Sequence, residues 1–257
     1  MSESTLIVKG SDLTREELAP VPAPSPTALS GPGLPAPNSV SVFVNQVICG
    51  DCVKIMRKMP NECVDLVITD PPYVAHYRDR TGRSMANDDQ AAWLKPAFWH
   101  IAHALKNNRY CISFYGWHKV DVFMAAWREA GFRPRAHFVW PKRYASGQKV
   151  VAYCHEQAFL LAKGDPPKPR LVLRDVLEWR YSGNVHHPTQ KPLIALRPLI
   201  EAYSNPGEIV FDPFAGSCST AEAAQQSGRQ YIAIELESRY CQPARERLAA
   251  ALLQTAL

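Results

Sequence analysis

Short apolar runs alternate with longer amphipathic stretches through most of this 257-residue chain. Runs such as VDLVIT (64–69) have the length and β-branched content of buried strands, and helix-like stretches lie between them. Alternating units of this kind predict an α/β fold with a doubly wound, mostly parallel sheet. The expected strands are 42–49, 64–69, 110–115, 136–140, 157–162, 208–211 and 231–235, and the expected helices are 53–59, 90–105, 119–130, 193–202, 219–227 and one from Ser238 onward.

The start of the chain has a different composition from the rest. Residues 19–39 are rich in Pro, Ala, Ser and Gly and have no hydrophobic period, so they do not favour helix or sheet. We therefore expect a disordered Pro-rich tail over 1–39 and one folded domain over 40–257.

Composition argues against a secreted, membrane or metal-dependent protein. The opening MSEST lacks the features of a signal peptide, and no apolar run approaches the length of a membrane span. The seven cysteines are an odd set, and the C-x-x-C at Cys49 and Cys52 has no second pair at zinc-ribbon spacing. We expect a cytoplasmic protein with free thiols, no membrane partner and no metal.

The net charge of +5 is mild, but basic residues gather in the middle of the chain beside Trp140 and Tyr144. Such a mixture suits a surface that contacts phosphates and stacks on bases. A solvated basic face would have the same composition. The cluster consists of Arg128, Arg133, Arg135, Lys142, Arg143 and Lys149.

Two short strings, TDPPY (69–73) and FDPFAGSCS (211–219), each follow a strand-like run. Ligands in open α/β sheets bind beyond the carboxyl ends of the strands, so both strings should face one cleft. In the second string, Gly216 and small serines allow a ligand to approach the backbone, and the next helix offers N–H groups to a carboxylate. Glu235 ends the following strand, where a ribose is commonly held, whereas the G-x-G-x-x-G of dinucleotide dehydrogenases is missing.

The string Asp70-Pro71-Pro72-Tyr73 carries the expected chemistry. Two prolines fix the backbone and remove two N–H donors, so the carboxylate and the carbonyls become rigid acceptors. Acceptors suit an exocyclic amino group of a nucleobase, whose nitrogen becomes more nucleophilic as its hydrogens are drawn away from the ring plane. Tyr73 would stack on a base flipped out of a duplex. A Pro-Pro turn with a core tyrosine is the plainer interpretation of this string alone.

Longer blocks around these strings resemble the amino-directed DNA methyltransferases, which use S-adenosyl-L-methionine to methylate N6 of adenine or N4 of cytosine. The resemblance covers roughly residues 40–252, and the catalytic string precedes the cofactor string as in the permuted β class. It implies a class I methyltransferase (Rossmann-like) fold with circularly permuted motif order. The blocks are ICGDCVKIMRKMPNECVDLVITDPPY, HEQAFLLAKG, HPTQKPLIALRPLI and IVFDPFAGSCSTAEAAQQSGRQYIAIELESRYCQPARERL.

The resemblance also implies roles for individual residues. Asp70 would accept a hydrogen bond from the target amine, with the Pro71 carbonyl as second acceptor, in a direct in-line transfer without a metal or a covalent intermediate. Asp51 would contact the adenine of the cofactor and Glu235 its ribose, while Lys191 belongs to the cofactor-side block. The methionine part would lie on the turn formed by Phe211, Asp212, Phe214, Gly216, Ser217 and Ser219.

The implied partner is double-stranded DNA with a flipped base, and family members imply a homodimer. DPPY looks more like the adenine-directed members, and N4 of cytosine is the alternative. Segment 164–187 stands where a target-recognition region is expected and is short, which predicts a short or relaxed recognition sequence. The candidate DNA-binding residues are Arg135, Lys142, Arg143, Lys149 and Arg174.

Two further readings stay open. Cys218 occupies a position where the family usually has a second glycine, so cofactor affinity should suffer if that position needs a positive φ. A non-catalytic DNA-binding or regulatory protein on a decayed methyltransferase scaffold is therefore one alternative. Methylation of RNA is another.

Overall fold

The structure is a computed structural model that describes residues 39–74, 91–145, 150–181, 183 and 190–255. Nearly all of the predicted tail lies outside the described residues. Within them, no helix is long and apolar enough to cross a lipid bilayer.

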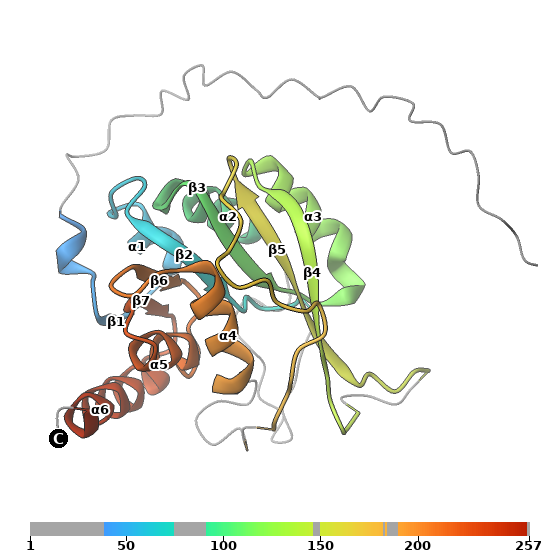
Figure 1. Cartoon of the computed structure of the whole chain (residues 1–257). Coiled ribbons are helices and arrows are strands. Elements are labelled where there is room, and N and C mark those ends of the chain that lie inside the picture. The colour runs from blue at the N-terminus through green and yellow to red at the C-terminus, as the bar shows by residue number, and fades with distance from the viewer. Residues whose placement is uncertain (1–38, 75–90, 146–149, 182, 184–189, 256–257) are drawn as a thin grey trace, which may run out of the picture. The chain divides into compact units, whose positions relative to one another are not determined.

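The described residues contain a seven-stranded sheet in the order β1-β7-β6-β2-β3-β5-β4 (Figure 1). Strands β1, β7, β6, β2 and β3 run parallel, and β5 is antiparallel to both β3 and β4. The predicted mostly parallel sheet is confirmed. The strands are β1 (Gln46–Cys49), β2 (Val64–Thr69), β3 (Leu105–Phe114), β4 (Arg133–Pro141), β5 (His155–Lys163), β6 (Ile209–Asp212) and β7 (Gln230–Glu235).

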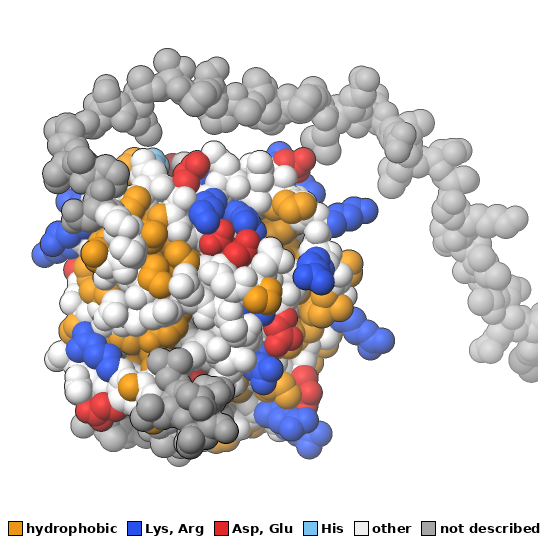
Figure 2. Space-filling view, turned by 60° about the vertical axis from the view of Figure 1, so that its left-hand side comes forward, with side chains coloured by type: hydrophobic (Ala, Val, Ile, Leu, Met, Phe, Trp, Pro, Cys, Tyr) orange, Lys and Arg blue, Asp and Glu red, His pale blue; other side chains and the backbone are white. Residues whose placement is uncertain are grey.

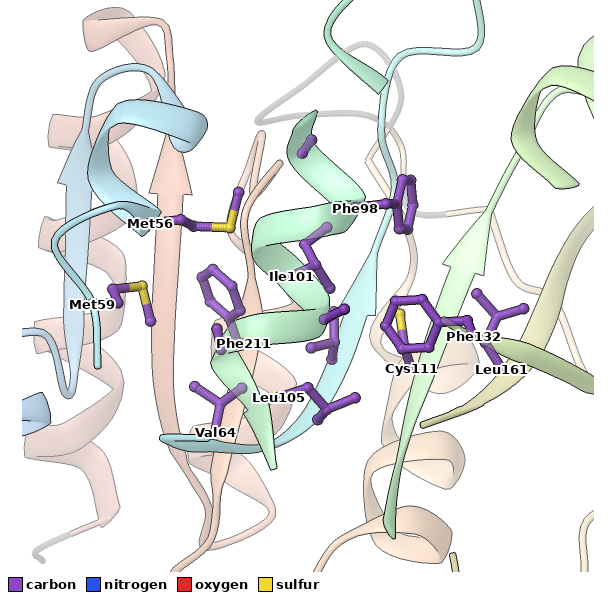
Figure 3. Close-up of a cluster of buried hydrophobic side chains, with 14 of the residues drawn as sticks. Met56, Met59, Val64, Phe98, Ile101, Leu105, Cys111, Phe132, Leu161 and Phe211 are labelled. Carbon is purple, nitrogen blue, oxygen red and sulfur yellow. The ribbon is translucent and has the colours of Figure 1, made fainter. Parts of the chain in front are cut away.

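Helices cover both faces of the sheet, and each face has its own apolar core. Alternate strand residues point to opposite faces, as Val67 and Leu66 of β2 do. Figure 3 shows part of the core on one of these faces, which includes Phe98, Ile101 and Phe211. The helices are α1 (Cys52–Met56), α2 (Leu94–Ala104) and α3 (Val120–Glu129) on that face, α4 (Leu193–Tyr203), α5 (Ser219–Gln226) and α6 (Ser238–Thr255) on the other, and the 3-10 turns η1 (Val40–Val42) and η2 (Trp117–Lys119).

Several element boundaries differ from those expected. β3 begins at Leu105, five residues before the expected start, and β4 begins at Arg133. Arg109 of β3 pairs with Lys163 of β5, so the ladder between these two strands continues beyond their apolar runs. The strand expected over 42–49 is shorter, because Asn45 adopts a φ of 57° and pairing with β7 starts only at Gln46.

The centre of the sheet is the place where the chain reverses its winding direction. β2 and β6 are parallel neighbours, with Leu66 opposite Val210 and Val67 opposite Phe211. From β6 the chain continues to β7 on one side, whereas from β2 it continues to β3 on the other. Crevices at such a switch point are where open α/β sheets bind ligands.

Candidate active site

A cleft lies at this switch point, beyond the carboxyl ends of β2, β6 and β7. Residues of both TDPPY (69–73) and FDPFAGSCS (211–219) line this cleft, in agreement with the expectation that the two strings face one cleft. The lining residues are Gly50, Asp51, Cys52, Val53, Asp70, Pro72, Trp93, Gln190, Lys191, Asp212, Pro213, Phe214, Ala215, Gly216, Ser217, Ser219, Thr220, Glu235, Leu236 and Glu237.

Both carboxylate oxygens of Asp70 have partners. The hydroxyl of half-buried Tyr73 donates to Oδ1 at 2.8 Å, and the ammonium of Lys191 donates to Oδ2 at 2.5 Å. Burial raises the pKa of Asp70, while the Lys191 charge and both hydrogen bonds act in the opposite direction. Asp70 is therefore a buried acceptor whose two oxygens are already engaged.

The ammonium of Lys191 contacts the acceptor residue of the cleft. This group lines the cleft and bonds to Asp70, and it lies 4.9 Å from the centre of the Phe114 ring and 5.7 Å from that of Tyr73. A second carboxylate, Glu156 of β5, has an oxygen 3.9 Å from the same nitrogen. Lys191 thus lies between two carboxylates, on the acceptor side of the cleft.

The turn after β6 is tightly tied to the end of β7. The Gly216 N–H donates to Glu235 Oε2 and the Glu237 N–H to Glu235 Oε1, each at 2.7 Å. Burial raises the pKa of Glu235, and these backbone donors oppose that rise. At the start of the turn, Asp212 accepts the Phe214 N–H at 3.1 Å, and burial raises the Asp212 pKa to about 7.

The turn ends at Cys218, which has a φ of 60° and a ψ of 31° and caps α5. Cys218 is fully buried, and the neighbouring Ser217 and Ser219 hydroxyls are 3.0 Å apart. This position does have the positive φ that favours glycine, so the cysteine is held in a strained backbone conformation.

Asp51 borders the cleft from the β1 side. Its side chain caps α1 by accepting the Lys54 N–H at 2.9 Å. The preceding Gly50 donates its N–H to the Glu235 carbonyl at 2.8 Å, which ties this loop to the end of β7. Asp51, Glu235 and the β6 turn therefore line one continuous wall.

Sequence reasoning missed several residues at or beside the cleft, among them Trp93, Gln190 and Glu156. Trp93 lines it, with its ring centre 5.1 Å from that of Phe214, and Gln190 also lines it. A tryptophan at a helix start carries no signal for a site. Glu156 carried no clear signal either, because polar His155 and Gln157 flank it at the start of β5.

The residues of the basic cluster differ in their exposure to solvent. Arg135 and Arg143 are exposed, as is Arg174, whose segment pairs with β4 through Val139. Figure 2 shows Lys and Arg side chains interspersed with Asp and Glu on the face it presents. Lys149 lies outside the described residues.

One residue beside the cluster, Trp140, and one member of it, Lys142, are buried instead of exposed. Trp140 is fully buried, so the expectation that it stacks on a base is wrong. The Lys142 side chain is only 3% exposed and its ammonium lies 2.7 Å from Glu156 Oε1, so this amine is not presented to a phosphate on the surface. Among the described residues, no three His, Cys, Asp or Glu side chains gather as they would around a metal ion.

Comparison with known proteins gives concordant results. A family model described as DNA methylase matches residues 64–246. "Putative methylase YubD" of Escherichia coli K12 is 51% identical over 207 residues, which cover 80% of this chain and 91% of that protein. "DNA adenine methyltransferase YhdJ" of the same organism is 28% identical, with 79% and 82% covered. The crystal structure of the M1.HpyAVI–SAM complex superposes with a TM-score of 0.63 at 26% identity, covering 79% of this chain and 98% of that one.

Proposed function

The chain belongs to the N6/N4 DNA methylase family, and from that premise we propose that it methylates N6 of adenine in double-stranded DNA. Its Rossmann-like methyltransferase fold and its use of S-adenosylmethionine follow from the same relatives. The choice of adenine and the assignment of roles to residues belong to the proposal. It rests on one observation: the Asp70 acceptor and the Glu235 turn converge on the cleft at the β2–β6 switch point.

The residues of the cleft fit this cofactor. Glu235 is a buried carboxylate of the kind that holds ribose hydroxyls, and the first-turn N–H groups of α5 suit a carboxylate. Trp93 and Phe214 offer aromatic faces beside Asp51, the proposed contact of the adenine. When bound, the cofactor supplies a methyl group on an electrophilic sulfonium.

The chain's own residues position the amine. Asp70 and the Pro71 carbonyl accept its two hydrogens, which localises the nitrogen lone pair, and Tyr73 stacks on the base. Because Asp70 lies at the buried end of its strand, the base has to leave the duplex stack to reach it. The amine does not have to lose a proton before it attacks the methyl group, and the methylated ammonium product sheds its proton afterwards, so positioning supplies much of the rate enhancement.

The adenine assignment is supported by the DPPY string and by the relative described as a DNA adenine methyltransferase. The test is incubation with unmethylated DNA or RNA of mixed sequence and methyl-labelled S-adenosylmethionine, followed by digestion to nucleosides. We expect label in N6-methyldeoxyadenosine. Label in N4-methyldeoxycytidine or in RNA nucleosides would replace the proposal with the corresponding alternative, and label in neither polymer would favour a non-catalytic scaffold.

Two variants test the assignment of roles. Asp70→Ala should abolish transfer and leave cofactor binding largely intact, because Asp70 serves the amine. Gly216→Val should weaken cofactor binding first, because its φ of 51° suits glycine and its N–H holds Glu235. Loss of cofactor binding in Asp70→Ala would contradict the assignment.

A further inference from the structure

Four charged side chains form a row that leads from Asp70 away from the cleft. Lys191 Nζ is 2.5 Å from Asp70 Oδ2 and 3.9 Å from Glu156 Oε2, and Lys142 Nζ is 2.7 Å from Glu156 Oε1. The exposed fractions of the Asp70, Lys191, Glu156 and Lys142 side chains are 20%, 9%, 20% and 3%. The row therefore alternates in sign, balances to zero charge and is largely shielded from water.

The far half of this row has no part in the chemistry proposed above. Glu156 is the second residue of β5 and Lys142 follows β4, and neither lines the cleft. Burying two charges is costly, and replacing such a pair by apolar residues is often neutral or stabilising. Stability alone is therefore a weak explanation for a second ion pair behind the first.

The near half presents a conflict between structure and function. The target amine needs an oxygen of Asp70, but Tyr73 occupies Oδ1 and Lys191 occupies Oδ2. A carboxylate oxygen can accept two hydrogen bonds, so the amine either shares Oδ2 with the ammonium of Lys191 or takes its place. In the second case the ammonium has to leave. An ammonium at a site this buried is strongly destabilised unless another carboxylate receives it.

Glu156 is placed to receive it. Its Oε2 is 3.9 Å from Lys191 Nζ, so a shift of roughly 1 Å would bring the pair to hydrogen-bond distance. Lys142 holds the other oxygen, Oε1, and so keeps the carboxylate from turning away. The Phe114 ring, 4.9 Å from Nζ, gives the cation a favourable surface beside this path.

We propose that Lys191 is a two-position latch: it rests on Asp70 and transfers to Glu156 when the target amine binds, and Lys142 holds Glu156 in place. Glu156 and Lys142 are positioning residues, since they act on the amine only through Lys191. The inference rests on the proposed function, because it assigns the amine to Asp70. It explains why the acceptor carries a counter-ion that can be exchanged for a substrate.

The first test needs no activity and is a crystal structure of the Asp70→Ala variant. Without the Asp70 carboxylate, Lys191 Nζ should lie within about 3.2 Å of Glu156 Oε2. In Asp70→Ala with Glu156→Gln, the ammonium should leave that position. A Lys191 that stays about 4 Å from Glu156 or turns into the cleft in Asp70→Ala would overturn the latch.

The second test measures single-turnover methyl transfer at saturating cofactor. Glu156→Gln keeps the side-chain size and removes the receiving charge, so the rate constant should fall about 10-fold or more, because the amine is then less well positioned. The dissociation constant of S-adenosylmethionine should change less than about twofold, because Glu156 does not line the cleft. Glu156→Asp should recover part of the rate.

The decisive comparison is made in a Lys191→Gln background. If Glu156 acts only through Lys191, Glu156→Gln should cause no further loss there, because the two losses share one interaction. Additive losses, or a parallel loss of cofactor affinity, would refute the latch. If the wild-type protein labels no nucleic acid, the proposed function fails, and the Asp70→Ala structure still decides the latch.

Glu208→Gln is the matched control. Glu208 is 18% exposed and its Oε1 lies 2.7 Å from Arg109, so it resembles Glu156 in burial and pairing but lies just before β6, at the opposite end of the sheet. Loss of the Glu208 charge should leave the rate of methyl transfer unchanged. An equal loss of rate in Glu208→Gln would mean that any buried ion pair matters, and the latch would be wrong.

Discussion

The ammonium of Lys191 lies 2.5 Å from Oδ2 of Asp70, the oxygen that the proposed chemistry reserves for a substrate amine. This contact neutralises a partly buried carboxylate without a substrate and favours its accepting, ionised form. The charge that stabilises the resting site is therefore also the group that the proposed latch moves when the amine binds.

Glu235→Gln should weaken S-adenosylmethionine binding by about 10-fold or more, because the carboxylate that accepts the Gly216 N–H, and that we propose as the ribose contact, loses its charge. Isothermal titration calorimetry measures the dissociation constant of S-adenosylmethionine. Glu237→Gln is the control, since Glu237 also lines the cleft but contributes its N–H instead of its side chain to the turn. Equal losses in the two variants would contradict a specific role for Glu235.

Cys218→Gly should change stability little. Relief of the left-handed backbone is worth about 1 kcal/mol, and it offsets the loss of a small buried side chain. Cys218→Val should lower the free energy of unfolding by at least about 2 kcal/mol, because a β-branched residue is disfavoured at this φ. Cys111→Val is the control, since Cys111 is equally buried but lies in β3, where valine is favoured. Thermal melts measure the stability of these variants, and titrations measure their affinity for the cofactor. Similar melting temperatures for the two valine variants would contradict backbone strain at Cys218.

Gly116→Ala should slow methyl transfer without weakening cofactor binding. A Cβ at this position would lie 2.9 Å from the Cβ of Tyr73 and 2.9 Å from the His118 ring, so Tyr73 would have to shift away from Asp70. Adding His118→Ala removes only the ring contact, so the defect should persist in the double variant. Full recovery there would show that the alanine acts on His118 and not on Tyr73.

Asp212 should make the protein less stable as the pH rises from about 4 to 7. Its folded pKa of about 7 exceeds the unfolded value of about 3.9, so across this window the native state keeps a proton that the unfolded state has lost. The stabilisation is complete below the window and lost above it. The raised pKa values of Asp70 and Glu235 act in the same direction.

Melts of wild type and Asp212→Asn at pH 5.5 and 8 test this prediction. The difference in stability between variant and wild type should shift in favour of the variant at the higher pH, by at most about 1.4 kcal/mol per pH unit. Asp121→Asn, at an exposed position of α3, should follow the wild type at both values. A constant difference between Asp212→Asn and wild type would refute the raised pKa.

The sequence predicted the sheet class and the shared cleft because both depend on local patterns. A buried run such as 64–69 specifies a strand, and its last residue fixes where Asp70 emerges. Trp93 and Glu156 escaped prediction because their roles depend on which segments pack together, and no local pattern records that. Lys142 was misplaced for the same reason: a lysine in a basic stretch has the same sequence signature whether its amine faces solvent or a buried carboxylate.

The pairing of β2 with β6 has a consequence for the geometry of the reaction. Backbones of neighbouring strands lie about 4.8 Å apart, and the Val67–Phe211 register holds the origins of the two loops at that interval. The pairing of β2 with β6 therefore sets the spacing at which the acceptor string and the cofactor string leave the sheet, although these two strings lie far apart in the chain. Because Val67 and Phe211 also belong to one apolar core, substitutions elsewhere in that core should alter the relative position of the two strings even though they lie in neither.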